Sequence, residues 1–308
     1  MQKLKHIVSA KQLANKKLLD QLFASAEQME RDDASRTLPQ PLHGRILATL
    51  FYEPSTRTRF SFEAAMQKLG GGVLSAENAK ESSSATKGES MADTMRIVSG
   101  YADAIAIRHY DEGTAAIAAA ASPVPVINAG DGIGEHPTQA LADMYTIRKE
   151  LGRLKNLKVS LIGDLLYGRT IHSLLPLLCL YEEVAITLVS PAQLRLPSRY
   201  IRYLKTKGVS FIETEKLDAS IRSADVIYVT RVQRERFASD EDYQRMKDAY
   251  IIDAKIADRL KSKAIIMHAL PRVSEIALDV DSNYRAAYFR QAKNAMYIRM
   301  ALLAYLLS

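Results

Sequence analysis

Short apolar runs rich in β-branched residues alternate along the chain with longer segments of helical periodicity. In the first half, the runs that predict strands cover residues 45–53, 71–76, 103–109 and 123–130. In the second half, they cover residues 158–164, 184–190, 208–213, 225–230, 250–254 and 264–270. Alternation of this kind is typical of parallel sheets whose strands are joined by crossover helices. The pattern therefore predicts an α/β protein with two doubly wound parallel-sheet domains joined by helices.

The helical segments indicate where the two domains meet. Apolar positions recur at helical spacing in residues 59–70, 88–101 and 136–154, and again from 283 to 308. Because the segment 136–154 lies between the two series of strands, we expect it to bridge the domains. A chain of 308 residues also suits two domains better than one or three. We place the first domain at 1–133 and the second at 134–287.

The amino-acid composition shows an excess of basic residues over acidic ones. Lys and Arg number 42 against 35 Asp and Glu, which gives a net charge of +7. Such an excess suits nucleic acid or an enzyme for small anions. The chain has no basic tail and no block of five or six Lys and Arg, so we expect no nucleic-acid partner. The single cysteine, Cys179, excludes an intramolecular disulfide and a cysteine-based zinc cluster, and its apolar surroundings favour a buried thiol.

The N-terminal segment carries scattered charges and lacks the apolar stretch of a signal peptide. No uninterrupted apolar stretch of about 18 residues occurs in the sequence. We therefore expect a cytoplasmic protein that does not span a membrane.

Three hydroxyl residues and two arginines fill the five positions after the first predicted strand. These are Ser55, Thr56, Arg57, Thr58 and Arg59, and a helical segment follows directly. The first N–H groups of a helix lack intrahelical partners, and together with the helix dipole they attract anions. Arginine adds paired hydrogen bonds suited to phosphate oxygens. An ordinary helix cap needs one hydroxyl, so three of them favour a phosphate site.

Two further segments bring polar side chains to strand ends. Arg108 ends an apolar strand, where α/β proteins often keep binding groups, although a solvated strand end is the alternative. His136 and Gln139 follow a glycine-rich stretch whose backbone can approach a ligand closely. A neutral imidazole at that helix start can donate a hydrogen bond to a carbonyl oxygen, although a lone histidine is more often structural.

The second half supplies cations and backbone carbonyls. Arg169 stands at a strand-to-helix turn that misses the P-loop pattern because arginine replaces its lysine, so a carboxylate suits it equally well. Arg231 and Gln233 follow the strand 225–230, where a solvated charged face is the alternative. Pro271 breaks the last strand and has no N–H, so it can expose the carbonyls that precede it.

The rest of the sequence offers few further candidates for a catalytic or binding site. Residues 75–90 are small and polar, and they form either a functional loop or a simple surface loop. The sequence shows no Ser-His-Asp pattern, no activated cysteine and no metal-ligand spacing. A site made of Arg, Lys, His, Thr and Gln favours electrostatic positioning of an activated anionic substrate, with no metal and no covalent intermediate.

These motifs occur together, in one order, in a known family. The stretches "FYEPSTRTRFSFE", "AIRH", "GEHPTQALAD", "GDLLYGRTIHSL", "RVQRERF" and "HALPRVSEIA" follow one another as in transcarbamoylases. Over essentially its whole length, the sequence resembles the catalytic chains of the aspartate carbamoyltransferase family. The resemblance implies transfer of the carbamoyl group from carbamoyl phosphate to the amine of L-aspartate. The products would be N-carbamoyl-L-aspartate and phosphate, in de novo pyrimidine biosynthesis.

The resemblance also implies a role for each candidate residue. Those implied to bind carbamoyl phosphate are Ser55, Thr56, Arg57, Thr58, Ser83, Arg108, His136, Gln139, and Leu270 and Pro271 through their backbone. Those implied to bind aspartate are Lys87, Arg169, Arg231 and Gln233. Those implied to be catalytic are Arg57, Thr58, Lys87, Arg108 and His136. Neither a metal nor an organic cofactor is implied, and we expect Arg59 to support the turn instead of binding substrate.

The resemblance extends to the assembly. In this family the residues corresponding to Ser83 and Lys87 serve the neighbouring subunit's site, which implies a homotrimer with shared sites. The C-terminal helix, residues 288–308, is implied to pack back onto the first domain. The sequence leaves open an allosteric holoenzyme with a separate regulatory chain. Any zinc domain must belong to that partner, because this chain has one cysteine.

Two alternatives fit less well. Ornithine carbamoyltransferases would share the phosphate half, but they typically carry "HCLP" where this chain has "HALP". Arg169 and Arg231 suit a dicarboxylate and would repel a diamino acid. The other alternative is a phosphate-sensing or nucleic-acid-binding module, which should bind without releasing phosphate from carbamoyl phosphate.

Overall fold

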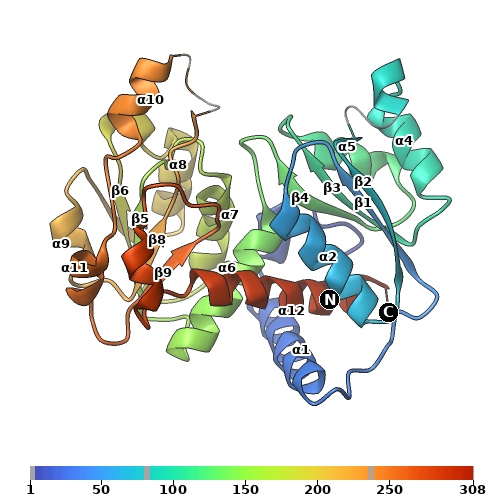
Figure 1. Cartoon of the computed structure of the whole chain (residues 1–308), viewed down its shortest axis with the longest axis horizontal. Helices are drawn as coiled ribbons and strands as arrows, with labels where there is room; N and C mark the ends of the chain where they lie inside the picture. The colour runs from blue at the N-terminus through green and yellow to red at the C-terminus, as the bar shows by residue number, and fades with distance from the viewer. Residues whose placement is uncertain (1–3, 80–83, 235–236, 238, 308) are drawn as a thin grey trace. The chain divides into compact units, whose positions relative to one another are not determined.

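The computed structural model describes residues 4–79, 84–234, 237 and 239–307. The chain divides into two compact units, shown in Figure 1. Unit 1 comprises Met1–Ala142 and Lys293–Ser308, and unit 2 comprises Asp143–Ala292. Two long helices, α6 (Pro137–Leu151) and α12 (Tyr288–Leu307), each run from one unit into the other.

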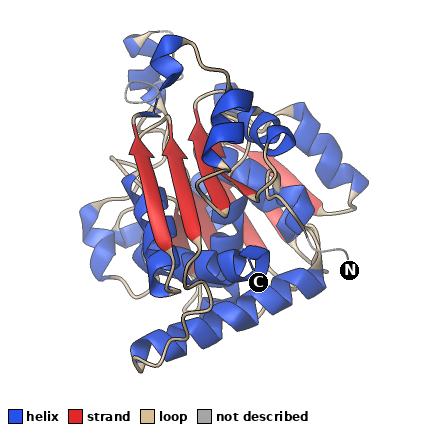
Figure 2. Ribbon diagram, turned by 90° about the vertical axis from the view of Figure 1, so that its right-hand side faces the viewer, coloured by secondary structure: helices blue, strands red, loops and turns tan. Residues whose placement is uncertain are grey.

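Unit 1 is built around a four-stranded parallel sheet with the order β2-β1-β3-β4. Its strands are β1 (Ile46–Phe51), β2 (Gly72–Glu77), β3 (Ala104–His109) and β4 (Val126–Asp131). Its helical elements are η1 (Ala10–Leu13), α1 (Lys16–Ala34), α2 (Thr56–Lys68), η2 (Ser84–Lys87), α4 (Met91–Val98) and α5 (Thr114–Ala121). Figure 2 shows parallel strands whose arrowheads lie at one end, with helices beside them. β1, β3 and β4 are almost wholly buried, as expected for a helix-covered parallel sheet, whereas β2 is a largely exposed edge.

Unit 2 is built around a five-stranded parallel sheet with the order β7-β6-β5-β8-β9. Its strands are β5 (Lys158–Ile162), β6 (Ala185–Val189), β7 (Ser210–Thr214), β8 (Val226–Val229) and β9 (Ile265–His268). Its helical elements are α7 (Arg169–Leu178), η3 (Ala192–Leu194), α8 (Ser198–Thr206), α9 (Leu217–Ile221), α10 (Asp240–Met246), α11 (Ala254–Asp258) and η5 (Leu278–Ser282). In both units the strand order reverses direction along the sheet, so the predicted doubly wound α/β fold is confirmed.

One strand prediction is wrong. Residues 250–254 form no strand: within this described segment Ile252 makes only an isolated bridge to Ile276. Asp253 instead caps α11, since its Oδ1 accepts the N–H of Ile256 at 2.8 Å. Aspartate is a preferred helix cap, so the segment turns into a helix where a strand was expected.

Three properties of the described residues bear on function. None of their helices is long and apolar enough to cross a bilayer. Nor do they gather three or more His, Cys, Asp or Glu side chains in a group that could hold a metal ion. Burial raises the pKa of the half-buried Cys179 thiol to about 11, so this thiol stays protonated at neutral pH.

Candidate functional site

The predicted phosphate site lies at the turn between β1 and α2, and the helix begins at Thr56. Ser55 occupies the N-cap position, yet within this described segment its hydroxyl makes no capping hydrogen bond. Thr56, Arg57 and Thr58 form the first turn, whose backbone N–H groups have no partner inside the helix. The helix therefore does not use Ser55 as an ordinary cap, which favours the anion-site interpretation over the capping one.

Thr58 and His136 meet in unit 1. Thr58 Oγ1 lies 3.5 Å from Nε2 of His136, and both side chains are buried. His136 immediately precedes α6, and its carbonyl accepts the N–H of Gln139 at 3.0 Å. Gln139 is buried in the first turn of this helix. The starts of α2 and α6 thus place a hydroxyl and an imidazole beside one another, where both can face one substrate atom.

Arg108 lies at the carboxyl end of β3, beside the same turn. Phe51 and Arg108 are register partners across the β1–β3 pair. Arg108 Nη2 lies 2.7 Å from Oε2 of Glu53, and Nη1 donates to the Ala129 carbonyl at 3.4 Å. Glu53 is a functional candidate that we did not single out from the sequence. The signal was present, because an acid stood next to a cluster of hydroxyl and arginine residues.

Arg59 supports the structure around this turn, as expected. Its Nη2 lies 2.7 Å from Oε2 of Glu77, and its Nη1 donates to Ser75 Oγ at 3.1 Å. Both partners belong to β2. Arg59 therefore ties α2 to the edge strand.

Glu135 holds the loop that ends at His136. Its Oε1 accepts a hydrogen bond from Ser9 Oγ at 2.7 Å, and its Oε2 accepts the N–H of Ala10 at 2.6 Å. Its own N–H donates to Oδ1 of Asp131 at 2.8 Å. Burial raises the pKa of the Glu135 carboxyl above its usual range. The N-terminal η1 segment is thus fastened to the loop that carries the imidazole.

The polar loop at 75–90 is only partly described. β2 takes up its first residues, and η2 covers Ser84–Lys87. Lys87, the last residue of η2, is exposed, whereas the predicted ligand Ser83 lies outside the described residues. Glu235, Arg236 and Ala238, in the loop after β8, lie outside them as well.

Three of the four predicted aspartate ligands, all except Lys87, lie at the carboxyl ends of β5 and β8 in unit 2. Arg169 is the first residue of α7, and Gln233 Nε2 donates to the Tyr167 carbonyl at 3.1 Å, so Gln233 lies beside the turn before α7. Arg231 follows Thr230, which joins the two strand ends because its Oγ1 donates to the Ile162 carbonyl at 3.0 Å.

The close approach of these strand ends requires glycine. A Cβ at Gly163, whose φ is +111°, would lie 2.4 Å from the carbonyl oxygen of Thr230. No side chain fits there, and L-residues rarely adopt that backbone conformation. Gly163 therefore lets Thr230 and the following Arg231 approach the β5–α7 turn.

The turn after β9 carries the backbone carbonyls predicted to meet the substrate. Leu270 has a φ of +57°, and the Leu270–Pro271 peptide bond is cis. Directly after it, Arg272 Nη2 pairs with Oδ2 of Asp281 at 2.5 Å. This turn therefore has a defined conformation with its chain fixed immediately downstream.

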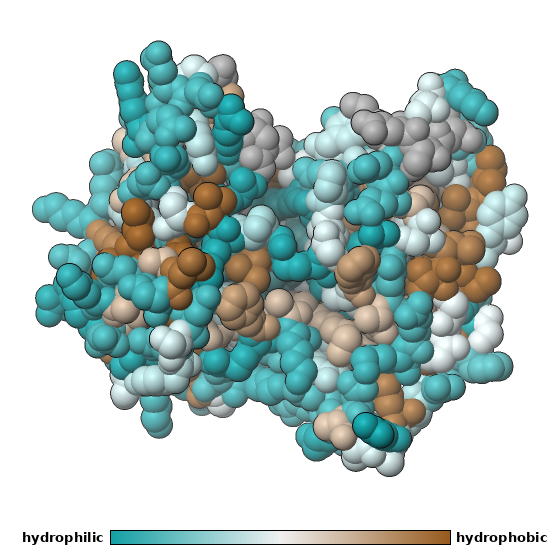
Figure 3. Space-filling model, in the orientation of Figure 1, coloured by the Kyte–Doolittle hydropathy of each residue, from teal (hydrophilic) through white to brown (hydrophobic). Residues whose placement is uncertain are grey.

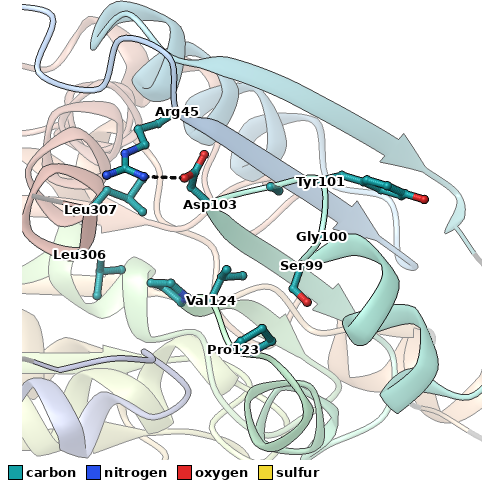
Figure 4. A pocket seen from close by; sticks show the side chains of 11 residues that line it. Arg45, Ser99, Gly100, Tyr101, Asp103, Pro123, Val124, Leu306 and Leu307 are labelled. Carbon is teal, nitrogen blue, oxygen red and sulfur yellow. Dashed lines mark hydrogen bonds and ion pairs between the residues drawn. The ribbon is translucent and has the colours of Figure 1, made fainter.

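A pocket of about 500 Å³ lies at the opposite end of the unit 1 sheet. Figure 4 shows Arg45 and Asp103, an ion pair at 2.7 Å, with Val124 and Leu306 among the residues that line it. Arg45, Asp103 and Val124 stand at the amino ends of β1, β3 and β4. Parallel α/β sheets bind ligands at the carboxyl ends of their strands. None of the described candidate residues lines this pocket, so it is separate from the candidate site.

Comparison with known proteins gives two family-model matches that together span nearly the whole chain. Residues 5–149 match "Aspartate/ornithine carbamoyltransferase, carbamoyl-P binding domain". Residues 155–306 match "Aspartate/ornithine carbamoyltransferase, Asp/Orn binding domain".

Individual relatives are similar over nearly the whole of this chain. The chain is 50% identical to the chloroplastic aspartate carbamoyltransferase of Arabidopsis thaliana, over 99% of this chain and 78% of that protein. It is 48% identical to the aspartate carbamoyltransferase catalytic subunit of Methanocaldococcus jannaschii, over 97% of each chain. It is 40% identical to Trypanosoma cruzi aspartate transcarbamoylase solved with carbamoyl phosphate and aspartate, with a TM-score of 0.94 over 99% of this chain and 98% of that chain.

Proposed function

Because the chain belongs to the aspartate/ornithine carbamoyltransferase family, we propose that its strand-end side chains bind carbamoyl phosphate and L-aspartate and join them. The enzyme is an aspartate carbamoyltransferase: it transfers the carbamoyl group of carbamoyl phosphate to the amine of L-aspartate. The products are N-carbamoyl-L-aspartate and phosphate. The observation that carries the residue assignment is the meeting of Thr58 and His136 beside the start of α2.

Unit 1 binds the phosphate and the carbamoyl oxygen in this proposal. The hydroxyls of Ser55 and Thr56, the first-turn N–H groups of α2 and the Arg57 guanidinium surround the phosphate. Arg108 replaces its contact with Glu53 by a contact with the substrate. Thr58 and His136 donate hydrogen bonds to the carbamoyl oxygen, and the Gln139 side chain lies beside the carbamoyl amino group.

Unit 2 binds the amine substrate. Arg169 and Arg231 each present a planar guanidinium that matches a carboxylate, and aspartate has two carboxylates. Gln233 supports this arrangement through the Tyr167 carbonyl. The carbonyls of Leu270 and Pro271 accept hydrogen bonds from the two N–H groups of the carbamoyl amino group.

The chemistry needs no covalent intermediate. The neutral amine of aspartate attacks the carbamoyl carbon, and negative charge grows on the carbamoyl oxygen. Donors already aimed at that oxygen stabilise the tetrahedral species. The C–O bond to phosphate then breaks, and the attacking nitrogen loses one proton to the departing phosphate. Loss of one such donor typically costs about 100- to 1000-fold in rate. Thr58, Arg108 and His136 supply these donors.

The ornithine alternative is tested by a carbamoylation assay of the purified chain, with aspartate and ornithine offered separately. We expect phosphate release and carbamoylation with aspartate alone, because Arg169 and Arg231 attract carboxylates and repel an ammonium group. Carbamoylation of ornithine without that of aspartate would contradict the specificity assignment. Binding of carbamoyl phosphate with no phosphate release in either case would favour a non-catalytic module.

The enzyme works as a homotrimer whose sites are shared between subunits. Exposed apolar side chains support an assembly: Leu74 on the edge strand β2, Ile97 on α4 and Phe60 on α2 are 45%, 48% and 54% exposed. Figure 3 shows hydrophobic residues gathered on the right-hand side of unit 1, near α4. Exposed apolar surface beside an uncovered strand edge is typical of an interface. Lys87 then reaches the neighbouring subunit's site.

Shared sites are tested by mixing inactive chains. Arg57→Ala and Lys87→Ala each inactivate their own homotrimer. If the two residues belong to one site contributed by two chains, hybrid trimers regain a fraction of sites with both residues intact. No recovery in hybrids of verified composition would contradict sharing.

The relatives' names support proposals on the pathway and the assembly of the enzyme. A carbamoyltransferase of aspartate supports a place in de novo pyrimidine biosynthesis. The Methanocaldococcus relative is named a catalytic subunit, which supports a complex with a further, separate chain. We place the protein in the cytoplasm, although the Arabidopsis relative is chloroplastic. Fractionation of the source cells and the mass of the complex purified from them test both assignments.

A further inference from the structure

A buried series of polar side chains in unit 2 leads to the end of β9. Tyr228 Oη donates to Asp143 Oδ2 at 3.0 Å, and Gln291 Nε2 donates to Asp143 Oδ1 at 2.6 Å. Gln291 Oε1 in turn accepts the backbone N–H of His268 at 3.0 Å. Each of these side chains is at most 3% exposed. The backbone of His268 is therefore fixed where the strand ends.

His268 holds the following turn through both ring nitrogens. Its Nδ1 accepts the backbone N–H of Leu270 at 2.7 Å, so this nitrogen carries no proton. Nε2 then carries the proton, and it lies 2.8 Å from Oε1 of Glu275. The imidazole thus accepts the Leu270 N–H on one side and lies against the Glu275 carboxylate on the other.

Glu275 holds the chain on the far side of the turn. Its Oε2 accepts the N–H groups of Val273 and Ser274, both at 3.1 Å. Burial alone would raise the pKa of this carboxyl, but hydrogen bonds from His268 and from the backbone lower that pKa below its usual range. Oε2 of Glu275 therefore holds two backbone N–H groups, while Oε1 lies against the His268 imidazole.

Leu270 lies between these two fixed points in a conformation that needs support. Its φ of +57° falls in the left-handed region, which residues with a Cβ rarely adopt. Such a conformation persists where its surroundings hold it, and it is common at ligand-binding turns. Within the described part of the chain, the carbonyl oxygens of Leu270 and Pro271 accept no hydrogen bond.

We propose that His268 and Glu275 are positioning residues that hold the Leu270 and Pro271 carbonyls toward the two N–H bonds of the carbamoyl amino group. The inference rests on the proposed function, in which these carbonyls bind carbamoyl phosphate. Neither side chain touches substrate; each acts through the backbone of the turn. The carbamoyl group is planar, so both acceptors must keep their directions for both N–H bonds to be satisfied.

The test compares Glu275→Ala with Asp225→Ala in the full-length enzyme. Asp225 is a suitable control because its carboxylate also accepts a backbone N–H, that of Lys158 at 2.9 Å, but precedes β8 at the other end of the sheet. We expect Glu275→Ala to raise the KM for carbamoyl phosphate about tenfold, as the loss of one or two hydrogen bonds would. The inhibition constant of inorganic phosphate should stay within about twofold, because phosphate has no amino group to present. Asp225→Ala should change neither constant, whatever it does to the unfolding midpoint.

If Glu275→Ala does not fold, a second pair of variants tests whether His268 positions the turn. In His268→Asn the side-chain oxygen can still accept the N–H of Leu270, since asparagine bonds its own backbone two residues on. We expect its KM for carbamoyl phosphate to rise less than that of His268→Leu. Equal losses of carbamoyl phosphate and phosphate affinity, or an unchanged KM in all His268 and Glu275 variants, would overturn the inference. An inactive wild-type enzyme would instead contradict the proposed function.

Discussion

Oε2 of Glu53 lies 2.7 Å from Nη2 of Arg108, so the arginine expected to meet the substrate already has an anionic partner. Both residues are near the start of α2, where the phosphate is expected. An incoming phosphate must therefore compete with a carboxylate for the same guanidinium. The ion pair keeps Arg108 in place before substrate binds. The Glu53 carboxylate also weakens the electrostatic attraction between Arg108 and an incoming anion.

Glu53→Gln should consequently tighten the binding of inorganic phosphate. Glutamine keeps a hydrogen-bond acceptor near Arg108 but removes the competing charge. Partly exposed ion pairs contribute about 0.2–1 kcal/mol, so we expect the dissociation constant of phosphate to fall by a factor of about 1.4 to 5. Titration calorimetry with phosphate measures it, and weaker binding would contradict the competition. Glu150→Gln, which alters an ion pair with Arg290 in unit 2, is the matched control.

His136→Asn should lower kcat and leave phosphate binding unchanged. Its imidazole, next to Thr58, is assigned to the carbamoyl oxygen, and loss of such a donor costs about 100- to 1000-fold. Steady-state kinetics give kcat, and the inhibition constant of phosphate reports how tightly the phosphate site binds. His172→Asn is the control, because His172 is an equally buried histidine that bonds the Leu165 carbonyl. A kcat within tenfold of wild type would remove His136 from the catalytic set.

Arg169→Lys and Arg231→Lys should each raise the KM for aspartate. Lysine keeps the positive charge but cannot make the paired hydrogen bonds of a guanidinium with a carboxylate. Since hydrogen bonds to charged groups contribute about 1.5–3 kcal/mol, we expect a rise of about 10- to 100-fold. The KM for carbamoyl phosphate should stay unchanged. Arg195→Lys, at an exposed ion pair with Glu215, should change neither constant.

Glu135→Gln should alter how stability depends on pH. Burial raises the pKa of Glu135, so the folded chain holds this proton more tightly than the unfolded chain does. Its contribution to stability is therefore greatest below the ordinary range of a glutamate and is lost as the pH rises through the folded pKa. Glutamine does not titrate. The thermal midpoint of the variant, relative to wild type, should thus be higher at about pH 8 than at about pH 4. A difference independent of pH would contradict this account.

The sequence predicts most of the fold because its strands are short, apolar and bounded by turn residues. It fails at 250–254, where the apolar residues Ile251 and Ile252 resemble a strand but Asp253 begins a helix. Helix capping is a local signal, but it was outweighed there by the apolar run. The sequence did indicate anion-binding residues at the starts of α2 and α7, since hydroxyls and arginines stand directly after buried strands.

Contacts between distant residues were not predictable in the same way. The meeting of Thr58 and His136 depends on where two separate helices start, which the sheet order controls and no local pattern reveals. The role of Glu275 depends on a turn that brings its side chain back to His268. In the sequence, Glu275 is a lone glutamate four residues after Pro271, and no local pattern links it to His268. Only the folded chain shows its partners.

A competition experiment offers ¹³C-labelled carbamoyl phosphate to the purified enzyme with equal amounts of L-aspartate and L-ornithine in one reaction, and so tests directly which amine the enzyme carbamoylates. Mass spectrometry follows the label, and a colorimetric assay follows phosphate. We predict that the label enters N-carbamoyl-L-aspartate, with one phosphate released for each molecule formed. Label in carbamoylated ornithine, or phosphate release without a carbamoylated amine, would contradict the account.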